Sequence, residues 1–173
     1  MFVGVVHALA LLLLVAAAAK LRDPSSAMAA LRRAGMPSSA LIVRLLATCE
    51  LAVASAALLL GGTVPAAALG LLHLAFAAFV FRLRQAAGPE AGCGCFGRAE
   101  APADRLHVVV NVVASCLVGL AVLGSTPSLP SVLQERIGLA APYLATVVLG
   151  AWVTGLCLTS LAALLTAQRE ATS

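Results

Sequence analysis

Five long apolar runs, each nearly free of charged residues, constrain what this 173-residue chain can fold into. They cover approximately residues 2–19, 41–60, 64–81, 106–123 and 142–166. A bilayer core about 30 Å thick requires roughly 20 apolar residues for each helical crossing. Membrane β-strands would instead alternate apolar and polar residues in shorter segments. The sequence therefore predicts an all-α, multi-pass membrane protein with five transmembrane helices.

Composition excludes an ordinary water-soluble domain. Of the residues, 62% are hydrophobic and 10% are charged, whereas soluble domains carry roughly 25% charged residues. No Lys or Arg precedes the first run, as the start of a signal peptide would require, so we expect that run to remain as a span. Only Gly61-Gly62-Thr63 separates the second and third runs, which predicts a tight antiparallel helix pair.

The basic residues are distributed unevenly about the five spans. With five crossings, every Lys and Arg except Arg136 falls on one side. The positive-inside rule makes that side cytoplasmic, with the N-terminus outside and the C-terminus inside a cell membrane. The net charge of +4 is thus explained by membrane topology and contact with lipid headgroups, and nothing indicates a nucleic-acid partner. The sequence also contains no phosphate-binding loop or hydrolase signature.

A short polar segment connects the first two runs. Asp23 can cap a helix that starts at Pro24, and Gly35 can end it. We expect an interfacial helix that carries Arg32 and Arg33.

Two cysteines lie in the glycine-rich loop between the third and fourth runs. Cys93 and Cys95 are separated only by Gly94, and such a pair can close a strained, exchange-active disulfide. Cations near the pair would favour the reactive thiolate. The candidates by sequence proximity are Arg82, Arg84, Arg98 and Arg105.

A metal site is the alternative for the same pair. A closed tetrahedral site needs four ligands, and the loop supplies two thiols, with His107 as a third candidate. This makes a metal site the weaker interpretation of the two cysteines.

Polar residues also occur inside the spans. Glu50 and His73 lie at similar depths and both face small residues, so we expect them to meet in the bundle interior. An intramembrane acid is either part of a functional site or part of a hydrogen-bonded pair that locks two helices. His107, Asn111 and Ser115 form a polar stripe that leads from the cysteine loop toward that layer.

The remaining residues with polar or reactive side chains in the spans are expected to be packing residues. Buried cysteine usually behaves as a small apolar residue. These positions are Cys49, Cys116, Cys157 and His7.

Taken together, these features resemble the methylamine-utilisation MauE family, related to DoxX-like proteins. The resemblance rests on Lys20-Leu21-Arg22-Asp23-Pro24, Gly35-Met36-Pro37, Glu50, Cys93-Gly94-Cys95-Phe96-Gly97 and Asn111. It implies a four-helix bundle over residues 1–125 and leaves the outer loop and fifth span, residues 126–173, outside the likeness. It also implies a part in methylamine dehydrogenase maturation through disulfide exchange with a thioredoxin-like partner.

The leading functional hypothesis is a membrane thiol-disulfide redox protein. Cys93 and Cys95 would exchange with the partner, and Glu50, His73 and Asn111 would bind a cofactor, with a membrane quinone as the candidate. The alternatives are a non-catalytic membrane scaffold and a small metal or solute carrier. Whether the chain is an enzyme and how it oligomerises stay open. The predicted cytoplasmic side of the thiols conflicts with disulfide formation in exported proteins, unless electrons cross the membrane or the topology is inverted.

Overall fold

The computed structural model describes residues 2–95, 102–135, 137–161, 164 and 168. Its elements in chain order are α1 (Val3–Arg22), α2 (Ser25–Arg33), α3 (Ala40–Leu59), α4 (Thr63–Ala87), α5 (Arg105–Val122), α6 (Leu129–Glu135), a 3-10 turn (Ile137–Leu139) and α7 (Ala140–Leu156), which continues as a π-helical turn (Cys157–Leu161). No strand is present in these ranges.

Five of the described helical segments are long and apolar enough to cross a membrane, which confirms the predicted fold class. The first four start within one residue of the predicted spans, and α4 continues beyond its predicted end to Ala87. The fifth segment is Ile137–Ser160. Most of the predicted end of the fifth span, and Phe96, Gly97, Arg98, Arg136 and Arg169, lie outside the described residues.

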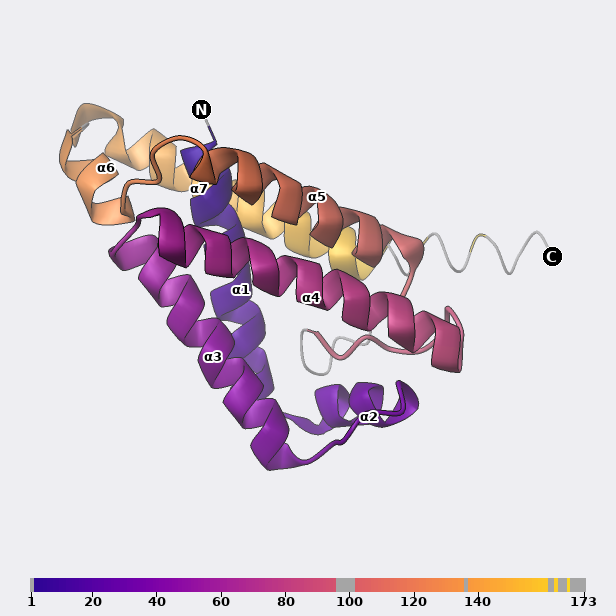
Figure 1. The fold of residues 1–173 in the computed structure, drawn as a ribbon. Helices are drawn as coiled ribbons and strands as arrows, with labels where there is room; N and C mark the ends of the chain where they lie inside the picture. Colours follow the sequence, from indigo (N-terminus) through magenta and orange to yellow (C-terminus); the bar gives the residue numbers. More distant parts are fainter. Residues whose placement is uncertain (1, 96–101, 136, 162–163, 165–167, 169–173) are drawn as a thin grey trace.

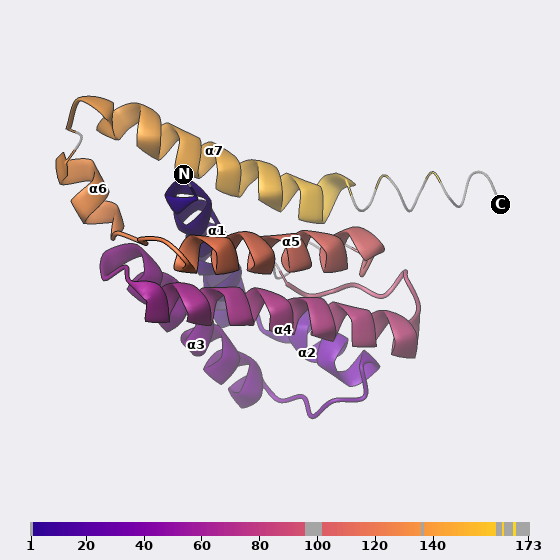
Figure 2. The same ribbon diagram turned by 45° about the horizontal axis from the view of Figure 1, so that its top comes forward.

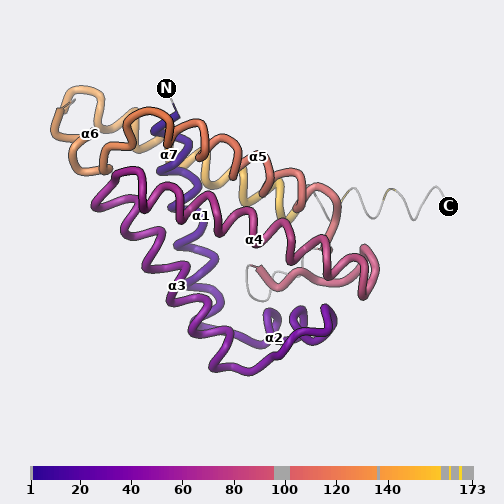
Figure 3. The backbone as a smooth tube through the Cα atoms, in the orientation of Figure 1, coloured from indigo at the N-terminus to yellow at the C-terminus, as the bar shows by residue number. Residues whose placement is uncertain are grey.

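The helices form two antiparallel pairs, α1 with α3 and α4 with α5, and α7 packs against α1. Figures 1 and 3 show that the end of α3 and the start of α4 meet at their short connection and that the two helices diverge from there. The helix pair predicted from that connection is therefore joined at one end rather than packed along its length. The physical reason is visible at the open end, where α2 and the loop between α4 and α5 lie between the two pairs (Figure 1).

Local sequence explains where α2, α3 and α5 begin. Asp23 Oδ1 accepts a hydrogen bond from the Ser25 backbone N–H at the start of α2, as the sequence predicted. Ser39 Oγ accepts from Ile42 N–H at the start of α3. Asp104 Oδ1 accepts from Arg105 N–H at the start of α5. Each cap satisfies a backbone donor that the helix itself leaves free.

The opposite end of the bundle is held by a buried histidine. His7 Nδ1 lies 2.7 Å from the Tyr143 hydroxyl and His7 Nε2 lies 3.1 Å from the Pro127 carbonyl oxygen. These contacts attach α7 and the loop between α5 and α6 to α1, and Figure 2 shows α7 lying alongside this end of the bundle. His7 is thus a packing residue, as expected from the sequence.

Every described Lys and Arg lies at the end of the bundle that carries α2. They occur at the C-terminal ends of α1 and α4, at the N-terminal ends of α3 and α5, and within α2. This clustering agrees with the uneven charge distribution seen in the sequence. The cytoplasmic orientation derived from it stays a prediction.

Candidate functional site

The cysteine pair lies in a tight turn on the loop between α4 and α5. Gly94 at the centre has a φ of +66°, in the left-handed region that favours glycine. The Cys95 backbone N–H donates to Cys93 Sγ at 3.4 Å, and the Cys95 thiol donates to the Cys93 carbonyl oxygen at 3.7 Å. Both thiols are free. The turn therefore brings two reduced sulfurs to one side of the loop.

The turn is pressed against the start of α2. A Cβ added at Gly94 would lie 2.7 Å from the Ser26 carbonyl oxygen and 2.8 Å from the Ala27 nitrogen. Only a residue without a side chain fits this approach. The contact places the thiols near the N-terminal end of α2, where the helix dipole favours negative charge.

The two thiols differ in acidity and exposure. The pKa of Cys93 is lowered to about 5, chiefly by the hydrogen-bonding Cys95 side chain and secondarily by His107, although burial opposes the shift. His107 Nε2 lies 3.6 Å from Cys93 Sγ. The pKa of Cys95 is raised well above its ordinary value because its proton is held toward Cys93 and because it is buried. These shifts favour the thiolate form at Cys93 and the protonated form at Cys95, and Cys95 is the more exposed of the two side chains.

The arginines near the pair in sequence have other contacts. Arg82 Nε donates to the Ala34 carbonyl oxygen at 3.0 Å, and Arg84 pairs with Asp104 at 3.2 Å. They bind α4 to α2 and to the loop. The side chain that contacts Cys93 Sγ is instead His107, which the sequence had suggested only as a third metal ligand and part of a polar stripe.

Glu50 is fully buried, as predicted, but its partner is Lys20 rather than His73. Lys20 Nζ lies 2.7 Å from Glu50 Oε2, and the two side chains are 3% and 0% exposed. The Lys20 ammonium also lies 5.0 Å from the centre of the Phe76 ring. A buried carboxylate this close to an ammonium can stay charged.

Sequence reasoning missed this ion pair because Lys20 was taken only as a topology charge. One pattern could have found it. Lys20 follows Leu9, Leu13 and Ala16 at helical spacing, so it continues the buried face of α1.

His73 has a separate partner on α5. Its Nδ1 lies 3.0 Å from Asn111 Oδ1, while Asn111 Nδ2 donates to the His107 carbonyl oxygen at 2.8 Å. Because the Asn111 side-chain oxygen can only accept, His73 Nδ1 is the donor in this hydrogen bond. Within the described part of the chain, buried His73 Nε2 and His107 Nδ1 have no hydrogen-bond partner.

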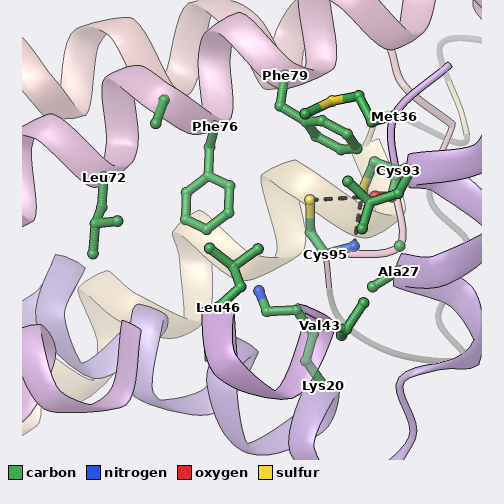
Figure 4. A pocket seen from close by; sticks show the side chains of 13 residues that line it. Lys20, Ala27, Met36, Val43, Leu46, Leu72, Phe76, Phe79, Cys93 and Cys95 are labelled. Atoms are coloured by element: carbon green, nitrogen blue, oxygen red, sulfur yellow. Dashed lines mark hydrogen bonds between the residues drawn. The ribbon is translucent and has the colours of Figure 1, made fainter. Parts of the chain in front are cut away.

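Two neighbouring cavities join these groups. The smaller, about 30 Å³, is lined by Lys20, His73, Cys95, His107 and Asn111 together with apolar side chains. It has room and polar partners for a water molecule. The larger, about 220 Å³, is mostly apolar and reaches Cys93, Cys95 and Lys20 (Figure 4). Lys20, Phe76 and Cys95 line both cavities, so the thiol pair and the intramembrane polar residues form one connected site.

Other sequence candidates lie apart from this site or are not supported by the structure. Cys49 and Cys116 are exposed on α3 and α5, and Cys157 is half-buried on the fifth span. In the described ranges, no three His, Cys, Asp or Glu side chains are arranged to hold a metal ion.

The part of the chain that builds this site also matches a known family. The family model described as Methylamine utilisation protein MauE matches residues 2–124. The chain belongs to the MauE family. The match covers α1 to α5 and ends just before the loop that leads to α6, so the MauE region contains every residue of the connected site except Leu158 in the wall of the smaller cavity. No curated protein and no solved structure matches the chain.

Membership and structure together establish a multi-pass membrane protein of the MauE family, which is named for methylamine utilisation. The α6 and α7 segments extend beyond the part that MauE proteins share in this match.

Proposed function

We propose that this MauE-family protein is a membrane thiol-disulfide exchange protein that forms disulfides in a thioredoxin-like partner and so assists maturation of another protein. The observation that carries the proposal is the asymmetry of the cysteine pair. Buried Cys93 Sγ accepts a hydrogen bond from the Cys95 backbone N–H and lies 3.6 Å from His107 Nε2, next to the more exposed Cys95. The pKa of Cys93 is lowered and that of Cys95 is raised.

This asymmetry suits the oxidised pair as a disulfide donor. A thiolate of the reduced partner attacks the accessible Cys95 sulfur, the Cys93–Cys95 bond breaks, and the electron pair leaves on Cys93. Thiols of low pKa are the faster leaving groups in such exchange. The partner's second thiolate then attacks the partner's first cysteine sulfur in the mixed disulfide. Cys95 is released and takes up a proton. The partner gains one disulfide, and the chain is left with two reduced cysteines.

A redox titration of the full chain tests the proposal. Cys49, Cys116 and Cys157 are replaced by serine, and the protein in lipid nanodiscs is equilibrated with glutathione buffers of increasing potential. Free thiols are counted by maleimide labelling and mass spectrometry. We expect Cys93 and Cys95 to lose labelling together in one two-electron transition. If both remain free in the most oxidising buffer, the exchange function is wrong.

A second measurement tests the direction of exchange. The oxidised chain is mixed with reduced thioredoxin as the probe partner. The control is a Cys93→Ser variant in which Cys95 forms a mixed disulfide with a small thiol, so that this thiol leaves in place of Cys93. We expect oxidised thioredoxin from the chain with both cysteines. If the intact pair oxidises thioredoxin no faster than the control, the leaving-group role of Cys93 is refuted.

One observation favours a scaffold as the second candidate. Cys93 packs in a buried cluster with side chains of α2, α4 and the loop, so it also contributes to packing. Replacing both loop cysteines by serine separates the two functions, because a scaffold would still support partner maturation and an exchange protein would not.

A further inference from the structure

The larger cavity lies where the two helix pairs diverge. Its walls come from the end of α1, from α2, α3 and α4, and from the cysteine turn, and it is partly open to the outside. Leu46 on the span α3 and Met36 in the connection after α2 belong to its lining and are exposed at the surface of the bundle. A ligand dissolved in the bilayer can therefore reach the thiols without entering water.

The size of the cavity limits what it can hold. An apolar cavity of about 150 Å³ accommodates benzene. A volume of about 220 Å³ thus holds one substituted ring and little more. A long hydrocarbon tail attached to that ring would extend through the opening into lipid.

The chemistry at the inner end selects the kind of ring. Most of the wall is apolar and includes Phe76 and Phe79, whereas Cys93, Cys95 and Lys20 supply a redox pair and an ammonium. Figure 4 shows the Cys95 sulfur and the Lys20 nitrogen directed into the same space beside Phe76. A lipid acyl chain has no group that would interact with either. A ring that accepts electrons and carries carbonyl oxygens would interact with both.

We propose that this cavity binds the ring of a membrane isoprenoid quinone and that the quinone oxidises Cys93 and Cys95. The inference rests on the proposed exchange function, because the quinone would regenerate the disulfide that is passed to the partner. Formation of the Cys93–Cys95 bond removes two electrons from the sulfurs and releases the Cys95 proton. The quinone takes up the two electrons and two protons and leaves as hydroquinone.

Lys20 supplies the second proton. Its ammonium is in the wall of the cavity and is held by Glu50 at 2.7 Å. The small cavity behind it, with room for water, provides a path for reprotonation past His73 and His107. Glu50, His73 and Asn111 thus lie behind the quinone as positioning and proton-transfer groups, rather than in the wall that contacts it.

The test fills the cavity with a side chain. Ala75 lines the cavity from α4, and Ala78 on the same helix is also exposed but does not line it. Ala75→Phe and the control Ala78→Phe are made in the background that keeps only the two loop cysteines. Each reduced protein in nanodiscs is mixed anaerobically with decylubiquinone, and loss of free thiol is followed in time. The same proteins are oxidised with glutathione disulfide as a reference.

We expect decylubiquinone to oxidise the pair in the parent and in Ala78→Phe, and to do so about tenfold more slowly in Ala75→Phe, which corresponds to roughly 1.4 kcal/mol of lost binding. Oxidation by glutathione should be equal in all three. The quinone site is wrong if glutathione disulfide oxidises the pair and decylubiquinone does not, or if both variants react with the quinone at equal rates. The proposed exchange function stands in either case. If neither oxidant acts, the exchange function itself fails. The quinone site is also overturned if phospholipid is the only molecule found bound in the cavity and Ala75→Phe does not change the rate of oxidation by decylubiquinone.

Discussion

Replacing Gly94 by alanine should destabilise the cysteine turn and raise the pKa of Cys93. The alanine must adopt a φ of +66°, which costs about 1–2 kcal/mol for a residue with a Cβ. Its Cβ would also lie 2.7 Å from the Ser26 carbonyl oxygen, closer than real contacts allow. Overpacking of this kind adds about 1–3 kcal/mol. We therefore expect Gly94→Ala to lower the free energy of unfolding by about 2–5 kcal/mol.

Gly35 offers a matched control for the backbone component. It has a φ of +68°, and a Cβ placed there meets nothing within 4 Å. Gly35→Ala should cost only the backbone term of about 1–2 kcal/mol. The difference between the two variants then isolates the contact between the cysteine turn and α2.

Two measurements check this prediction. Thermal unfolding in the same detergent compares the stability of the two variants, and the pH dependence of iodoacetamide alkylation reports the acidity of Cys93. Moving the turn away from α2 should shift the alkylation midpoint of Gly94→Ala upward, while Gly35→Ala keeps the parent midpoint. The reasoning would be refuted if the two variants were equally stable and alkylated with the same midpoint.

Three further predictions follow from the geometry. Because the pKa of Cys93 is lowered to about 5, the alkylation rate of the reduced protein should stay at its plateau at neutral pH and decline only as the pH falls toward 5. His107→Phe should move this decline to higher pH, because His107 contributes to the lowered pKa. An unchanged pH profile would exclude His107 as the partner of the Cys93 thiolate. Lys20→Met should lower the free energy of unfolding by about 3–5 kcal/mol, because Glu50 is left charged and unpaired. Chemical unfolding of the double variant with Glu50→Gln should show that most of this loss is recovered. No recovery would contradict the ion pair. Tyr143→Phe should cost about 1 kcal/mol in thermal unfolding through its lost contact with His7 and leave glutathione oxidation of the loop cysteines unchanged, whereas altered oxidation would show coupling between the two ends of the bundle.

The spans were predictable because hydrophobic run length is a local property that the bilayer thickness converts directly into helices. The same holds for the start of α2, where Asp23 and Pro24 specify a helix start within a few residues. The turn at Gly61-Gly62 was also identified, but its consequence was not. A short connection determines that the end of α3 lies beside the start of α4, and it does not determine the angle between the two helices.

The candidate site was only partly predictable. The sequence identified the cysteine pair, the burial of Glu50 and the polar face of α5, since each follows from spacing along one segment. It assigned Glu50 to His73, whereas the structure pairs Glu50 with Lys20 and His73 with Asn111. Equal depth in two spans does not establish contact, because the rotation and separation of the helices decide which side chains meet.

The sequence by itself determined that this chain crosses a membrane as helices, that its basic residues lie mostly at one end, and that two thiols share a glycine turn at that end. Only the tertiary structure decided that His107 contacts Cys93, that Lys20 pairs with Glu50, and that one cavity is lined by both thiols and by Lys20. These features combine residues from segments far apart in the chain. Their assembly depends on α2 and the loop packing into the space where the helix pairs diverge, which no local pattern encodes.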